Sequence, residues 1–443
     1  MKRQILLMLA FLPAAAAAQE RMTLTVDEAV KIGLENSKSL HASSMNVEAA
    51  EARSAGYATQ KLPQVKFGGS YTRLSDIPPA EIGPFPPILP DKVTLSPSLL
   101  ENYNLRLSFT QPIFTGFRLQ SGSNAAEYAA KAAGADLARD RSQLVYDITA
   151  AYWNLYKANE FKKVIDENVS QMKAHLADVR SLFDQGIVTK NEVLKVEVQL
   201  SSAQLLQLDA GNNVRLATIA LNNTIGTPLR NEISVASVAP LVSREYGEVD
   251  SLIALSYERR PELEGVAQRV RAGEENVTAA RSGWFPQVYL AGNYNYARPN
   301  ARIFPALDQF KDTWDVSLSV SLDIWNWGAT IHQTDEAQAQ LSQARDHLGE
   351  LRDGIALDVT QAYLTFGQSK ERIGVAGQAV GEAEENYRIT NEKFKAGLAL
   401  NSDLLDAEVA LLQAKWNSIQ ALVDHELADA RLRKAIGEDT PHY

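Results

Sequence analysis

Two acidic side chains near the C-terminus are spaced so that both carboxylates could act together. Asp403 and Asp406 lie three residues apart, so on a helix they would share one face. Carboxylates that symmetry repeats around a pore bind cations and select for them. Asp403 also stands where an acid in a first helical turn would stabilise the helix N-terminus. Asp406 falls in the second turn, where that structural explanation does not apply.

Catalytic and metal-binding patterns are absent from the rest of the sequence. The six histidines form no HExxH motif and show no ligand spacing. There is no glycine-rich phosphate loop and no nucleophile elbow. The chain has no cysteine, which excludes disulfides, thiolate zinc sites and iron–sulfur clusters. We therefore expect no enzyme, no metal and no cofactor.

Composition limits the partners of this chain. Its 443 residues are 45% apolar and 22% charged, which is ordinary for a folded protein. The 54 acidic residues outnumber the 44 basic ones, for a net charge of -10. A surplus of acids cannot neutralise phosphates, so we expect no nucleic-acid partner.

The elements that must position the two aspartates belong to a duplicated chain. Residues 182–200 match residues 393–411 at an offset of 211, and residues 63–71 match residues 286–294 at an offset of 223. The difference of 12 residues places one insertion in the first copy, in the proline-rich stretch 77–90. Proline there excludes a helix or a central strand. Because a single gap explains the whole match, we interpret the chain as two structural repeats.

The sequence of each repeat predicts the following order of elements: a helix, a strand, a loop, a second strand, a long helix, a turn and a final helix. The proline-free stretch Phe117–Asp184 would span roughly 100 Å as a helix, so it needs lateral partners along its length. Capping boxes are predicted at Thr25 with Glu28 and at Thr189 with Glu192. The expected helices are residues 26–60, 117–184, 189–225, 249–282, 329–396 and 402–436.

The strands carry a strict alternation of apolar and polar residues. Val316 to Ile324 alternates over nine residues without error. Aromatic residues flank the segments, a pattern typical of transmembrane β-barrels, although a half-buried soluble sheet also alternates. Serine on the polar face and tryptophan at the strand ends favour the membrane. Since four strands are too few to close a barrel, we expect an oligomer. The expected strands are about residues 64–74, 104–114, 287–297 and 315–325.

The N-terminus predicts export from the cytoplasm. Lys2 and Arg3 precede an apolar run and a small-residue cleavage site, which together indicate a secretory signal peptide. With the strand pattern, this indicates a Gram-negative outer-membrane protein. The expected organisation is signal peptide 1–18, first repeat 19–227, equatorial linker 228–248, second repeat 249–437 and tail 438–443.

The duplicated plan and its two tip sequences resemble the TolC-like outer-membrane efflux family over essentially the whole mature chain. The tips are FDQGIVTKNEVL (Phe183–Leu194) and FKAGLALNSDLLDAE (Phe394–Glu408). The resemblance implies a mixed membrane α/β fold, in which a homotrimer forms a 12-stranded β-barrel continued by a long periplasmic α-helical barrel. It implies outer-membrane lipid, a periplasmic membrane-fusion adaptor protein and an inner-membrane pump of RND or ABC type as partners.

The resemblance also implies roles for residues at the tips. Asp403 and Asp406 match the two acids of the family's selectivity gate. Gly186 and Gly397, the predicted hairpin turns, would meet the adaptor.

The chain departs from the family pattern at the latch of this gate. Ala399 and Phe394 stand where an arginine and a tyrosine would help to lock it, while Glu192 keeps the acidic partner. We therefore expect closure by packing of Phe394, Leu398 and Leu400 as a hydrophobic constriction.

Three functions are compatible with these patterns. The leading hypothesis is a passive exit duct of a tripartite efflux pump that exports small molecules such as drugs, toxic compounds or metals. An outer-membrane duct of a type I protein secretion system would have the same fold. A coiled-coil envelope protein or adhesin is a third alternative, but a stalk has no need for a second amphipathic strand pair.

Overall fold

The computed structural model describes residues 22–236 and 244–438. The expected signal peptide at 1–18, residues 237–243 of the expected linker and the tail beyond residue 438 lie outside the described residues. Two compact units divide the chain, and each unit contains segments of both sequence repeats. The first unit consists of the residues up to 42, 138–260 and those from 353 onwards, and the second of 43–137 and 261–352.

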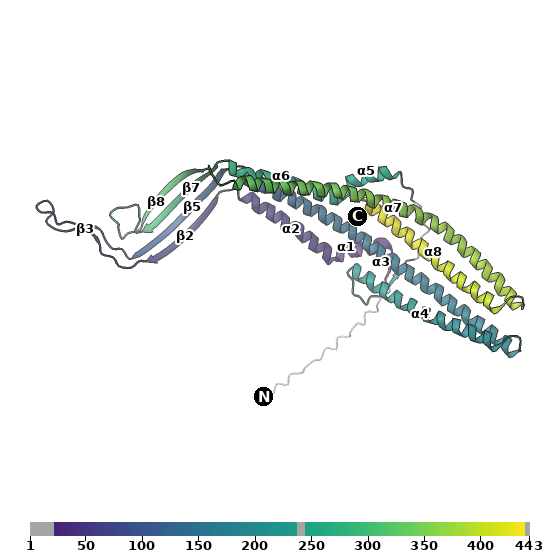
Figure 1. Cartoon of the computed structure of the whole chain (residues 1–443). Coiled ribbons are helices and arrows are strands. Elements are labelled where there is room, and N and C mark those ends of the chain that lie inside the picture. Colours follow the sequence, from purple (N-terminus) through teal and green to yellow (C-terminus); the bar gives the residue numbers. More distant parts are fainter. Residues whose placement is uncertain (1–21, 237–243, 439–443) are drawn as a thin grey trace, which may run out of the picture. The chain divides into compact units, whose positions relative to one another are not determined.

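Most of the described chain is helical (Figure 1). Helices α3 and α7 are each 67 residues long and contribute residues to both units. Within residues 22–236 and 244–438, no helix is both long and apolar enough to cross a membrane. The helices are α1 Val26–Asn36, α2 Lys38–Thr59, α3 Arg118–Asp184, α4 Lys190–Thr224, α5 Val249–Arg259, α6 Pro261–Ala280, the short 3-10 helix η1 Arg281–Trp284, α7 Ala329–Lys395 and α8 Asn401–Ala435.

Two helices that the sequence predicts as continuous are each interrupted. The expected helix 26–60 breaks at Ser37, whose backbone is extended and caps α1. The expected helix 249–282 breaks at Arg260, which is extended because Pro261 follows it. Pro261 then begins α6, where a missing N–H costs nothing. At the start of α1, the capping box of Thr25 and Glu28 is confirmed.

Four antiparallel strands form the sheet of the second unit, in the order β2-β5-β7-β8 (Figure 1). Strand β8 ends at Ser321, four residues before the expected end at 325. The edge strands β2 and β8 each have one neighbour in the part of the chain that the structure describes. The strands are β2 Gln64–Arg73, β5 Glu101–Thr115, β7 Gln287–Arg298 and β8 Lys311–Ser321.

The register of this sheet separates apolar from polar side chains. On one face Val65 lies opposite Phe109, and Leu290 lies opposite Leu318. On the other face directly paired residues are joined through their side chains. Arg106 Nε donates to Asn295 Oδ1 at 2.7 Å, and Asn293 Nδ2 donates to Asp315 Oδ2 at 2.9 Å.

Two short strand pairs were not predicted. Strand β1, Met22–Leu24, pairs in parallel with β6, Ile233–Val235, and so ties the expected linker to the start of the first repeat. The proline-rich insertion contains β3, Ala80–Ile82, paired with β4, Val93–Ser96.

The core of the first unit holds α1, α3 and α4 together. Ile148 and Leu155 of α3 and Leu221 near the end of α4 are fully buried in one cluster. Gly33 on α1 lets this helix approach closely, because a Cβ at that position would overlap the Ile148 side chain. Thus the first repeat is tightly packed here.

Candidate functional site

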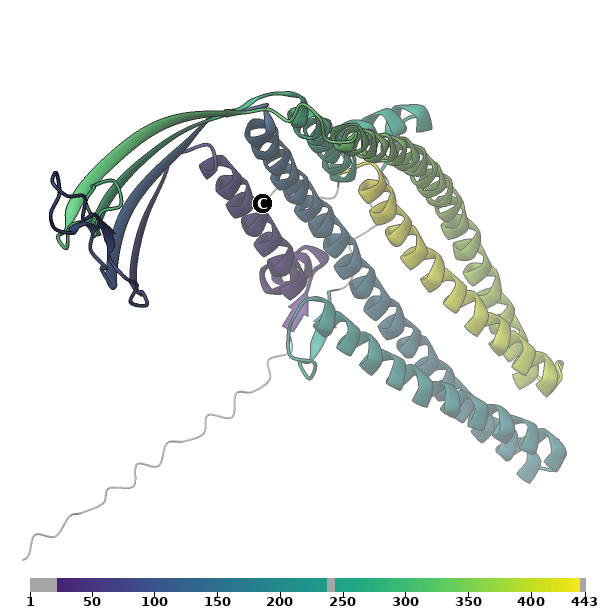
Figure 2. The same ribbon diagram turned by 60° about the vertical axis from the view of Figure 1, so that its left-hand side comes forward.

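Two helical hairpins of the first unit carry the residues that the sequence singles out (Figure 2). Hairpin A is α3 with α4, and hairpin B is α7 with α8. Gly186 and Gly397 turn the chain with φ of 75° and 74°. In hairpin A the Ile187 N–H donates to Leu182 O at 2.9 Å, and in hairpin B Leu398 N–H makes the equivalent bond at 2.8 Å. The two copies therefore share one turn structure, which glycine adopts without strain.

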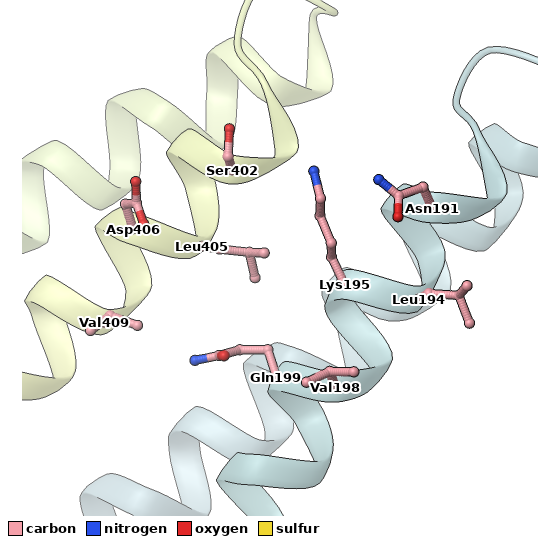
Figure 3. Close-up of a pocket in the computed structure, with 9 residues that line it drawn as sticks. All are labelled: Asn191, Leu194, Lys195, Val198, Gln199, Ser402, Leu405, Asp406 and Val409. Atoms are coloured by element: carbon pink, nitrogen blue, oxygen red, sulfur yellow. The ribbon is translucent and has the colours of Figure 1, made fainter.

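A groove with a volume of ≈ 500 Å³ lies between α4 and α8 just behind these turns. Figure 3 shows Lys195 and Leu405 extending into the space between the two helices. Exposed Leu194, Val198 and Val409 give the groove apolar walls. Its lining residues are Asn191, Leu194, Lys195, Val198, Gln199, Ser402, Leu405, Asp406 and Val409.

The two aspartates on α8 occupy different surroundings. Both are exposed. Asp403 Oδ2 accepts a hydrogen bond from the Leu400 N–H at 3.1 Å, so this carboxylate satisfies the start of its own helix. Asp406 lines the groove and has no such contact with the helix start. Asp406 is thus the more available of the two for an ion, and a gate role for either residue stays a prediction.

The predicted capping box at Thr189 and Glu192 is wrong. The Thr189 side chain makes no capping hydrogen bond. Glu192 instead accepts from Lys195 Nζ at 2.9 Å and from Asn401 Nδ2 of hairpin B at 2.9 Å. These contacts lower the pKa of the Glu192 carboxyl, with Lys195 the larger cause. The Glu192 carboxylate therefore binds a lysine of its own helix and an asparagine of hairpin B.

Asn401 continues this link into the interior of the first unit. Its Oδ1 lies 2.8 Å from Nε2 of the buried His175 on α3. Since the Asn401 amide nitrogen is turned toward Glu192, its oxygen accepts and His175 Nε2 carries the proton. Burial lowers the pKa of His175, so its neutral form is favoured. Sequence reasoning missed both His175 and Asn401, because no motif relates them.

The three residues of the expected hydrophobic constriction lie in different environments. Phe394 is buried in a core cluster with Leu404 and contacts the His175 ring at a centroid distance of 5.2 Å. Leu398 and Leu400 are 79% and 69% exposed on the turn of hairpin B. Phe394 therefore supports the tip from within, while the two leucines are free to contact a partner. Their role in a constriction stays a prediction.

Sequence reasoning also missed Glu408 on α8. It is 2% exposed, and both of its carboxylate oxygens are buried without a hydrogen-bond partner in the part of the chain that the structure describes. No group of three or more histidines, aspartates or glutamates that could hold a metal ion occurs among the described residues.

A family model described as "Outer membrane efflux protein" matches residues 30–227 and 252–438. "Outer membrane efflux protein BepC" of Brucella suis is 22% identical over 335 residues, which cover 75% of this chain and 72% of that protein. "Alkaline protease secretion protein AprF" of Pseudomonas aeruginosa is 24% identical over 58% of this chain and 53% of its own length.

Solved structures show the same fold. The outer membrane protein VceC from Vibrio cholerae superposes with a TM-score of 0.78 at 18% identity, covering 93% of this chain and 96% of that chain. The predicted TolC-like fold class is thereby confirmed.

Proposed function

The chain belongs to the outer membrane efflux protein family, and from this premise we propose that it is the outer-membrane exit duct of a tripartite efflux pump. Three copies would place their strands in the outer membrane and their helical hairpins in the periplasm. An inner-membrane transporter would deliver small molecules through a periplasmic adaptor, and the duct itself would supply no energy and no chemistry.

The apolar face of the β2-β5-β7-β8 sheet carries this proposal. Phe67 on β2 is 73% exposed and Val316 on β8 is 67% exposed, and no described element covers the side chains between them. A soluble sheet would bury such a face, whereas lipid tails are the natural solvent for it. The other exposed apolar side chains of the sheet include Val65, Tyr71, Leu105, Leu107, Phe109, Tyr294, Tyr296, Leu318 and Val320.

The edges and the polar face of the same sheet support assembly around water. Strands β2 and β8 each leave one edge without a partner among residues 22–236 and 244–438. Open edges in a bilayer are very costly, so further copies would continue the sheet until it closes. Three copies of four strands give the 12-stranded barrel that the family resemblance implies. The pairs Arg106–Asn295 and Asn293–Asp315 would then face the water-filled interior.

The hairpin tips supply the proposed periplasmic end. The turns at Gly186 and Gly397 would meet the adaptor, with the exposed Leu398 and Leu400 beside them. Symmetry would repeat Asp403 and Asp406 as rings of carboxylates, which attract cations.

Conductance tests the duct. The purified protein should form trimers that conduct ions when reconstituted into planar bilayers. A protein that inserts but does not conduct would contradict the proposal, and so would a stable monomer in detergent.

The gate residues are tested in the same bilayer. Asp403→Ala combined with Asp406→Ala should reduce the preference for cations by several-fold and weaken block by divalent cations, because the carboxylate rings are gone. Asp184→Ala is the matched control, an exposed acid at the tip of hairpin A that we do not assign to the gate. If both variants keep wild-type selectivity, the gate assignment is wrong.

Type I protein secretion is the second candidate, because one relative is named an alkaline protease secretion protein. The two candidates differ only in partner and cargo. A deletion strain that accumulates small toxic compounds, and whose duct co-purifies with an adaptor and an RND pump, would support efflux. Loss of one secreted protein, with co-purification of an ABC exporter, would support secretion.

A further inference from the structure

Glu408 is a buried acid that the proposed duct does not use. It lines a small cavity between α8 and α3, together with Val164, Asn168 and Gln171 of α3 and Leu411 of α8. The space left next to it is only about 10 Å³, room for one water molecule at most. Neither carboxylate oxygen has a hydrogen-bond partner among the described residues. An ionised carboxylate would be costly in such a place.

The duplication shows that this environment is specific to the second repeat. At the offset of 211 residues, Glu408 corresponds to Glu197 of α4. Glu197 forms a salt bridge with Arg180 of α3, with 2.6 Å between Oε1 and the guanidinium nitrogen. The residue that corresponds to Arg180 is Asn391, so hairpin B lacks this cation. Glu408 has kept the carboxyl group but not the charge that would hold it ionised.

The charged groups around Glu408 do not replace that arginine. Glu167 of α3 and Glu384 of α7 are acids, and both lie near the ammonium of Lys415, at 3.3 Å and 3.8 Å. Lys415, the cation of α8 that lines this cavity, is therefore already shared by two carboxylates. Tyr387 of α7 is a further titratable neighbour, and it supplies no positive charge. Burial raises the pKa of Glu408 to about 7.

We propose that Glu408 binds a proton in the folded protein, and that losing this proton loosens the packing of α8 on α3. The neutral carboxyl group can stay in the interior, whereas the ionised group gains by reaching water. We call Glu408 a proton-sensitive pin, because its neutral form would keep α8 of hairpin B packed on α3.

The position of the pin gives it a consequence for the tip. Glu408 lies on the same helix as Asp406 and within two helical turns of Asp403. A shift of α8 away from α3 would move both acids together. At acidic pH the tip of hairpin B should therefore stay packed on α3. When the pH rises through neutrality, α8 and the tip should become able to move away from α3. This last step rests on the proposed duct function, whereas the proton site itself does not.

Infrared difference spectroscopy of the purified full-length protein tests the proton site directly. A protonated carboxylic acid has a carbonyl stretching band separate from the carboxylate bands. As the pH is raised, the wild type should lose such a band with a midpoint near pH 7, the value to which burial raises the pKa of Glu408. Glu408→Gln should abolish the change, and Glu197→Gln, the matched control in hairpin A, should leave it intact. A wild-type spectrum without this band, or a band that survives in Glu408→Gln, would overturn the proposal.

Hydrogen exchange tests the packing. Peptides that cover residues 404–415 should exchange roughly tenfold faster in the wild type than in Glu408→Gln at about pH 8, and at similar rates at about pH 6, since one pKa unit corresponds to a tenfold ratio of states. Comparing the two proteins at each pH cancels the intrinsic pH dependence of exchange. If the ratio of exchange rates between the wild type and Glu408→Gln is the same at both pH values, the proposal that Glu408 controls this packing is refuted. Glu408→Leu provides a second variant without the proton, in case the glutamine does not fold.

The two experiments keep this proposal separate from the duct. A protein that shows the infrared band and the exchange change but never conducts would leave the pin standing and refute the duct. A conducting protein whose Glu408 shows no band would do the reverse.

Discussion

Hairpins A and B have helices of equal length but use their acids differently. Each turn has a glycine with positive φ and the same hydrogen bond across it. In hairpin A, Glu192 reaches across to Asn401 of hairpin B. Its counterpart in hairpin B, Asp403, bonds to the backbone of its own helix start. The duplication has preserved the fold of the tip while the carboxylates took separate roles.

The second pair of acids diverges further. Glu197 is paired with Arg180, whereas Glu408 is buried and unpaired among the described residues. Asn391 stands at the position that corresponds to Arg180, so hairpin B has no arginine there. Two acids at equivalent positions of the repeats thus have different roles, because different residues surround them. Four pairs of variants, one residue from each hairpin, test whether the hairpins differ in this way.

The largest expected effect is on core packing. Leu404 of hairpin B is 1% exposed, and its counterpart Val193 of hairpin A is slightly more accessible and smaller. Leu404→Ala should lower the free energy of unfolding by about 3 kcal/mol and Val193→Ala by about 1 kcal/mol, because the leucine leaves a larger cavity. Thermal unfolding in detergent, followed by circular dichroism, measures both. Equal losses would mean that the two hairpins pack alike.

The next effect is a dependence of stability on pH. The pKa of Glu408 is about 7 in the folded protein against 4.5 for the free side chain, so the folded state binds more protons between these values. Stability should therefore fall as the pH rises from about 4.5 to about 7, by about 3 kcal/mol, and then level off. Glu408→Gln should remove this slope and Glu197→Gln should keep it. If stability depends on pH equally in the wild type, Glu408→Gln and Glu197→Gln, another titratable group causes the dependence.

Removing the link between the hairpins should cost somewhat less. Asn401→Ala deletes the bonds to Glu192 and to His175 and leaves a buried ring nitrogen unpaired. We expect a loss of about 1.5 kcal/mol. The counterpart Lys190→Ala, at an exposed site, should change stability by less than about 0.5 kcal/mol. The melting temperatures of the two variants measure these losses. If Asn401→Ala leaves the melting temperature unchanged, the bonds of Asn401 to Glu192 and His175 do not stabilise the protein.

The smallest effect should be equal in the two hairpins. Gly186→Ala and Gly397→Ala each place a Cβ at a positive φ, where it has no other atom within 4 Å. Only backbone strain opposes them, so each should cost about 1 kcal/mol. Clearly unequal losses in the melting curves would show that the turns are not equivalent.

The sequence could predict the elements because their signals are local. Apolar alternation located the strands to within a few residues, and a glycine at each tip marked the turns at Gly186 and Gly397. The break at Arg260 was also local, since Pro261 disfavours a helical residue before it, but the long helical pattern around it hid this signal. The break at Ser37 has no comparably strong marker in the sequence.

The candidate site was predicted less completely. The family resemblance pointed to Asp403, Asp406 and Glu192, yet it gave no sign that Glu192 would bond to Asn401 or that His175 would lie beneath them. These contacts join residues that are more than 200 positions apart, such as 209 for Glu192 and Asn401. A repeat aligns each residue with its copy and says nothing about such neighbours.

The duplication, the type and order of the main elements and the absence of cysteine chemistry all follow from the sequence, because periodicity, turn residues and composition are properties of the chain. The tertiary structure decided how the copies combine, since each compact unit draws on both repeats. It also decided which acid caps, which one bridges and which one is buried. Burial and partners arise only when distant segments pack together, and they control the charge of a carboxyl group.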